Sequence, residues 1–205
     1  MATLEDATRR QNGGEPITRE RVRHLPGELG TWVFILGDMT VFALLFGIFM
    51  YYRDKQPALF AHSQLTLHKS FGVINTLLLL TSSLCVVTAV RAVRKGAQRL
   101  PTILLGVAVV CGLGFTLNKF LEWGGLLSHH HYPDTNNFYM YFFVLTGIHF
   151  FHLLLGMGVL TALIVLSRKP SLSEKEMMFF EGGACFWHMV DLLWIVLFAL
   201  LYLVH

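Results

Sequence analysis

The chain ends in the stretch CFWHMVDLLWIVLFALLYLVH, residues 185–205, which is long and apolar enough to cross a lipid bilayer as one helix. It contains two ionisable residues, His188 and Asp191, three positions apart. On a helix these side chains share one side, and Phe198 and Tyr202 fall in the same sector. A charge at membrane depth costs about 2.5–3.5 kcal/mol on insertion scales. We therefore predict that this face meets other protein, with His188 and Asp191 forming a structural pair or handling protons or a ligand.

The composition is that of a polytopic membrane protein. Of the 205 residues, 54% are hydrophobic and 14% are charged, whereas soluble domains contain roughly 25% charged residues. The sequence has no basic face interleaved with aromatic residues, the pattern that would indicate nucleic acid as a partner. The three cysteines show neither paired metal spacing nor a disulfide framework. We interpret them as small buried apolar residues.

Hydropathy and segment length predict an all-α fold, a polytopic membrane bundle of about five transmembrane helices. The expected spans are about 30–52, 71–93, 101–123, 138–166 and 180–203. Residues 1–24 are polar and contain two adjacent glycines and a proline, so we expect a flexible cytoplasmic tail there. The remainder, 25–205, is expected to form a single transmembrane domain.

Lysine and arginine are distributed unevenly between the two sides of this predicted bundle. One side carries twelve of them: Arg9, Arg10, Arg19, Arg21, Arg23, Arg91, Arg94, Lys95, Arg99, Arg168, Lys169 and Lys175. The other side carries Arg53, Lys55 and Lys69. By the positive-inside rule we predict a cytoplasmic N-terminus and a C-terminus on the outer side.

Polar residues also occur at membrane depth in the first and fourth predicted spans. Their depths overlap with those of the pair in the last span, and such groups are stable in a bilayer only when they face protein or water. This predicts one internal polar seam made of Asp38, Thr146, His149, His152, His188 and Asp191.

Other residues of the spans are suited to packing between helices. Lys119 and Glu122 can form an ion pair at i, i+3 near the end of the third span. Asn75 is expected to donate a hydrogen bond to another helix. Small residues allow close helix contact in membranes, which we expect in the fourth span at Gly147, Gly156 and Gly158.

The polar residues alone leave several functions open. His149 and His152, with His188 from the next span, could ligate a metal or haem iron, although the spacing is a weak signal. Histidines and carboxylates along a seam could instead relay protons, as in pumps and transporters. A transporter fits less well, because the chain shows no inverted repeat. The structural alternative is an oligomeric membrane subunit with a buried polar seam.

Two motifs resemble subunit III of the haem–copper oxidases. The run TGIHFFHLLLGMG (146–158) is similar to the family's TG-x-H-x-x-H helix, and FWHMVDLLWIVLFALLY (186–202) is similar to its final helix. The resemblance covers about Leu25 to the C-terminus. The chain departs from the family in having Asp38 where a glutamate is usual and in lacking two N-terminal helices. Glu122 falls at the position of a family glutamate, and the opening LPGELGTWVFILGDMTVF looks most like a branch associated with nitric oxide reductases.

The resemblance implies an accessory, non-catalytic subunit of a cytochrome c or quinol oxidase in the bacterial cytoplasmic (inner) membrane. Such a subunit carries no haem, copper or other metal of its own. It packs against the catalytic haem-bearing subunit, supports its assembly, proton uptake and stability, and holds phospholipid in a cleft. The polar seam, with Glu122, Trp187 and Trp194, would hold the bundle together and line that cleft. The alternatives are an accessory subunit of a nitric oxide reductase and a stand-alone membrane cytochrome.

Overall fold

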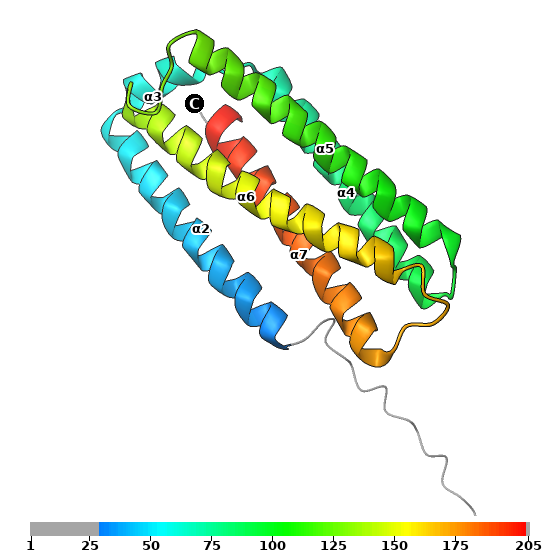
Figure 1. Ribbon diagram of the computed structural model, residues 1–205. Helices are drawn as coiled ribbons and strands as arrows, with labels where there is room; N and C mark the ends of the chain where they lie inside the picture. Colours follow the sequence, from blue (N-terminus) through cyan, green and yellow to red (C-terminus); the bar gives the residue numbers. More distant parts are fainter. Residues whose placement is uncertain (1–28, 204–205) are drawn as a thin grey trace, which may run out of the picture.

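The computed structural model describes residues 29–203 as helices joined by short loops (Figure 1). The predicted tail at 1–24 lies outside the described residues. The elements are α2 (Leu29–Lys55), α3 (Pro57–Gln64), α4 (Lys69–Arg94), α5 (Arg99–Ser128), α6 (Asn137–Leu166) and α7 (Glu174–Phe198), which continues into the π-helical turn η1 (Ala199–Leu203). There is no strand between Leu29 and Leu203.

Five of these helices are long and apolar enough to cross a membrane, namely α2, α4, α5, α6, and α7 with η1. The predicted all-α bundle of five spans is confirmed. The short helix α3 lies in the link that joins the first two spans. It begins with Pro57, a residue that favours the first turn of a helix because its missing N–H needs no partner there.

The last span lies at the centre of the bundle (Figure 1). It packs against α6, α4 and α2, while α5 covers α4 and α6. In its most apolar window 50% of the residues are buried, compared with 17% for α2. The end of the bundle that contains α3 and η1 is called the α3 end. The opposite end contains the loops after α4 and α6 and is called the basic end.

The last helix begins at Glu174, several residues before the predicted start near 180. The reason is a capping box at its N-terminus. Ser173 accepts a hydrogen bond from the backbone N–H of Glu176, and the Glu176 carboxylate accepts one from the backbone N–H of Ser173. At the same end, Arg94 and Glu181 form an ion pair at 2.8 Å that joins α4 to α7.

The third span also continues past its predicted end near 123, through Gly124 and Gly125 to Ser128. It ends in a Schellman motif, since the N–H of His131 donates to the carbonyl of Leu126 at 3.0 Å and that of His130 donates to Leu127. His130 takes the left-handed conformation that the motif requires, with φ 61°.

Two tryptophans of α7, Trp187 and Trp194, are fully buried at the centre of the bundle. Trp187 packs against Gly156 of α6 so closely that a Cβ at this glycine would lie 2.8 Å from the indole ring. Gly147 and Gly158 have no atom within 4 Å of an added Cβ. The prediction of close helix contact is therefore right for Gly156 and wrong for the other two glycines.

We expect Gly156→Ala to destabilise the bundle by about 1–3 kcal/mol, because the new methyl group would displace a fully buried indole. Gly158→Ala is the matched control on the same helix. There the helix propensity of alanine should leave stability unchanged or raised by up to about 1 kcal/mol. Unfolding of both variants by SDS in mixed micelles would measure the difference, and equal stability would contradict the packing described here.

Candidate functional site

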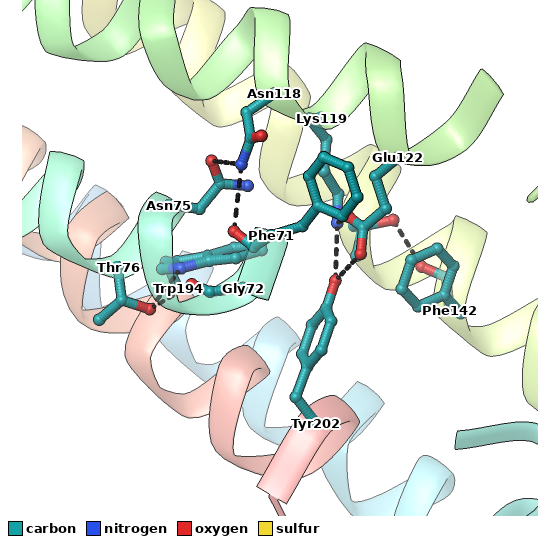
Figure 2. Close-up of polar contacts among 11 residues, drawn as sticks. Phe71, Gly72, Asn75, Thr76, Asn118, Lys119, Glu122, Phe142, Trp194 and Tyr202 are labelled. Carbon is teal, nitrogen blue, oxygen red and sulfur yellow. Dashed lines mark hydrogen bonds and ion pairs between the residues drawn. The ribbon is translucent and has the colours of Figure 1, made fainter. Parts of the chain in front are cut away.

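An ion pair lies buried within α5. Lys119 Nζ donates to Glu122 Oε2 at 2.6 Å, and only 1% and 3% of the two side chains are exposed. Tyr202 from η1 donates its hydroxyl to Glu122 Oε1 at 2.5 Å and accepts from Lys119 Nζ at 3.3 Å (Figure 2). The predicted i, i+3 pair is confirmed, and with Tyr202 it forms a three-residue group, called here the Glu122 cluster.

Aromatic rings complete the surroundings of the Lys119 ammonium group. It lies 4.8 Å from the ring centroid of Phe142 in α6 and 5.0 Å from that of Trp194 in α7. Such cation–π contacts gain strength when the cation is removed from water. The cluster and these two rings therefore join α5, α6 and α7 around one buried cation.

Three more hydrogen bonds beside the cluster hold α4 to its neighbours (Figure 2). Asn118 of α5 donates through Nδ2 to Asn75 Oδ1 at 2.7 Å and to the Phe71 carbonyl at 3.1 Å. Trp194 donates through Nε1 to Thr76 Oγ1 at 3.1 Å. The interhelical bond predicted for Asn75 exists, but Asn75 accepts it and does not donate it.

Asp38 of α2 and His152 of α6 form a second polar group. His152 Nε2 lies 3.1 Å from Asp38 Oδ1, with 11% and 14% of the two side chains exposed. His152 Nδ1 lies 2.8 Å from the Ile148 carbonyl, which can only accept, so Nδ1 must carry a proton. The contact between Asp38 and His152 links α2 to α6.

His149 is fully buried, and neither ring nitrogen has a hydrogen-bond partner among residues 29–203. It packs against the rings of Phe115, with centroids 5.8 Å apart, and Trp194, at 5.3 Å. Thr146, one turn earlier, bonds back to the Phe142 carbonyl of its own helix at 2.6 Å. Neither residue therefore makes a polar contact with another helix.

His188 and Asp191 meet through a third residue, Ser83 of α4. Ser83 Oγ lies 2.6 Å from His188 Nδ1 and is also close enough to the Asp191 carboxyl group to interact with it. The direct pair predicted for the last helix is therefore wrong. Asp191 Oδ1 is buried and finds no partner within the part of the chain that the structure describes.

The structure thus places the predicted polar residues, apart from Thr146 and His149, in three groups centred on Glu122, on Asp38 with His152, and on Ser83. His149 lies within electrostatic range of Lys119 and His152, although no hydrogen bond connects them. Between Leu29 and Leu203 no three or more His, Cys, Asp or Glu side chains are grouped so that they could hold a metal. His149, His152 and His188 therefore do not form a shared ligand set.

Several contributing residues were not assigned to a polar group from the sequence. Tyr202 and Ser83 complete two of the polar groups, and Gln64 of α3 donates through Nε2 to the carbonyls of Leu200 and Leu201 at 3.3 and 3.1 Å. The position of Tyr202 on the face shared with Asp191 was a usable signal. Ser83 and Gln64 carry no comparable pattern, because hydroxyls and amides at span positions are common.

An apolar pocket of about 420 Å³ lies between α2, α6 and α7, nearer the basic end. Its walls include Phe34, Val159, Phe179 and Phe186, and Gly182 and Gly183 of α7 also line it. None of the residues predicted to line a lipid cleft lines this pocket. They lie deeper in the bundle or, in the case of Glu122, beside a different pocket.

The fold and these groups define an integral membrane protein whose ionisable side chains join its own helices. The sequence matches the family model for cytochrome c oxidase subunit III over residues 26–205. The chain belongs to this family.

Curated relatives agree with the family match. Cytochrome c oxidase subunit 3 of Bacillus sp. (strain PS3) is 28% identical over 191 residues, covering 92% of both chains. The subunit of the same name from Alkalihalophilus pseudofirmus is 30% identical over 181 residues and 85% of both chains. Quinol oxidase subunit 3 of Bacillus subtilis is 28% identical over the same share.

Removing one charge of the buried ion pair should destabilise the protein more than removing both. Glu122→Gln or Lys119→Met alone leaves an unpaired buried charge, which costs about 3–5 kcal/mol. The double variant removes this penalty, so it should be more stable than either single variant. A double-mutant cycle in SDS titrations measures the coupling, and additive effects would show that the pair is not coupled.

Asp191→Asn should be tolerated better than Asp191→Leu, because asparagine keeps an acceptor for the Ser83 hydroxyl. Loss of that acceptor in the leucine variant should cost about 1–3 kcal/mol. The matched test is Ser83→Ala, whose effect should not add to that of Asp191→Leu. Equal accumulation and stability of the asparagine and leucine variants would argue against the Ser83 link.

Proposed function

We propose that the protein is the non-catalytic subunit III of a bacterial haem–copper oxidase that works in aerobic electron transport. The observation that carries this proposal is the family match over 26–205, which spans nearly the whole chain. Relatives named as subunits of cytochrome c oxidases and of quinol oxidases both support it. The proposal therefore names the type of complex and not its electron donor.

In this role the chain packs against the haem-bearing catalytic subunit and supports its assembly, its proton uptake and its stability. The internal contacts are consistent with such a role. The Glu122 cluster and the Ser83 group bind helices of the same chain together, and His152 and His188 are engaged by Asp38 and Ser83. Haem and copper would then be held by the partner, and this subunit would contribute a rigid helical surface.

We further propose that a phospholipid acyl chain occupies the apolar pocket between α2, α6 and α7. Its walls are mostly aromatic and aliphatic, and α2 is the least buried span, so lipid can reach the pocket from the side. Lipid would contribute contacts that α2 does not obtain from protein.

The location that fits these roles is the bacterial cytoplasmic (inner) membrane, with the basic end in the cytoplasm. Arg91, Arg94 and Lys95 at the end of α4 lie at the same end as Arg168 and Lys169 after α6. Lysine and arginine near span ends are retained on the cytoplasmic side. The α3 end would then face outward.

The two alternatives have less support. The oxidase names of the relatives favour an oxidase over a nitric oxide reductase. A stand-alone cytochrome would need iron ligands, and His149 packs among aromatic rings while His152 and His188 pair with separate residues.

We expect the tagged chain, extracted from native membranes in mild detergent, to co-purify with a larger haem-bearing subunit and with oxygen-reducing activity. A triple variant, His149→Ala with His152→Ala and His188→Ala, should leave the haem spectrum per catalytic subunit unchanged even where it lowers the yield. Consumption of nitric oxide in place of oxygen would support the reductase, and a haem spectrum that stays with this chain alone would overturn the proposal.

A further inference from the structure

A second pocket, of about 610 Å³, lies at the α3 end of the bundle. It lies between the link joining α3 to α4 and the last turns of α5. Its polar lining residues are Thr66, His68, Glu122, His129 and His131. Three imidazoles and a carboxylate around one pocket contrast with the apolar walls of the pocket beside α2.

Several contacts hold the mouth of this pocket in place. His131 follows the Schellman motif that ends α5 and stacks on Tyr139, with ring centroids 4.7 Å apart and ring planes at 18°. The Tyr139 hydroxyl bonds to Thr66 Oγ1 at 2.8 Å. Both walls of the pocket are thus fixed to α6.

Glu122 connects this pocket to the interior of the bundle. It lines the pocket, while its two carboxylate oxygens accept from Lys119 and Tyr202, which do not line it. The Glu122 cluster is therefore a buried group of an acid, an amine and a phenol, and its acid borders the pocket.

We propose that the α3-end pocket is a hydrated cavity through which the Glu122 cluster exchanges protons with the aqueous phase at that end of the bundle. The volume exceeds that of one water molecule many times, and its lining offers several polar partners for water. Imidazole is the side chain that exchanges protons most readily near neutral pH, so His68, His129 and His131 suit the mouth of such a path. The inference does not depend on which complex contains the chain.

The titratable groups around Glu122 are few and come from three elements. Lys119 belongs to α5, Tyr202 to η1, and His149 of α6 lies within electrostatic range of Lys119. From α4 the neighbouring polar group is Asn75, which does not titrate. Lys119 as an ammonium and Tyr202 as a phenol already carry their protons, so a proton that reaches the cluster is held by the Glu122 carboxylate.

Two adjacent glycines of α5 provide a matched test of hydration. A Cβ added to Gly124 or Gly125 meets no atom within 4 Å, and only Gly125 lines the pocket. In the assembled complex, in membranes, with the three cysteines replaced by serine, we compare Gly125→Cys and Gly124→Cys. A charged, membrane-impermeant thiol reagent should label Gly125→Cys about tenfold faster or more, because an ion does not enter hydrocarbon. If an acyl chain fills the pocket, the thiol reagent labels both cysteines at the same rate, and the proposal fails.

Access to the carboxylate itself is tested with an impermeant carbodiimide that carries a quaternary ammonium group. It activates Glu122, the Lys119 amine attacks the activated carbonyl, the urea leaves with one carboxyl oxygen, and an isopeptide bond forms. Mass spectrometry should find this cross-link, with the loss of one water, when the reagent is added on the side of the α3 end.

The same glycines supply the control for the cross-link. Gly125→Leu fills the pocket and should suppress cross-linking, whereas Gly124→Leu should not. Absence of the cross-link in the unmodified pocket, or an equal yield in both leucine variants, would overturn the proposed path to Glu122.

Discussion

The burial of a lysine and a glutamate inside α5 is the constraint on which much of the bundle depends. Taking both charges out of water costs several kcal/mol per ion, and their mutual attraction offsets this only when other partners complete the geometry. Lys119 and Glu122 are neighbours on one helix, so by themselves they do not join anything. Tyr202 supplies the missing partner from the end of the chain. The last helix must therefore return to the α3 end beside α5.

Close packing and polar contacts act together to place α7 at the centre. Trp187 lies against Gly156, and Gly183 of α7 lies against Val159 of α6, so these helices approach closely along one side. On the other side Trp194 donates to Thr76 and Ser83 binds His188, which fixes α4. In a bilayer, where lipid tails compete for apolar contacts, small residues and interhelical hydrogen bonds are the main sources of helix association.

Much of this architecture could be predicted from the sequence, because span length and hydropathy are local properties. The same holds for Lys119 with Glu122, since their spacing alone brings them together on a helix. The early start of α7 was also readable, because Ser173 and Glu176 have the spacing of a capping box. The hydrogen-bond partner of His188 could not be predicted, since Ser83 lies 105 positions away in the sequence and only the packing of α4 on α7 brings the two residues together. For His149, hydropathy predicted burial in the bundle but could not predict that its ring would lie among aromatic rings without a polar partner.

The placement of α2 follows from the same physics. This helix has the least protein around it, and many of its apolar side chains are exposed, including Val33, Leu36 and Leu44. Apolar contacts with lipid are about as favourable as apolar contacts with protein, so they do not decide how α2 is rotated. A carboxyl group at membrane depth does decide the rotation of α2, because Asp38 avoids hydrocarbon only by facing His152. The aromatic contact of Phe42 with the same imidazole, at 5.4 Å between centroids, lies one helical turn further on. Asp38 and Phe42 together thus set the rotation of α2 against α6, and its opposite face is left to lipid or to a partner subunit.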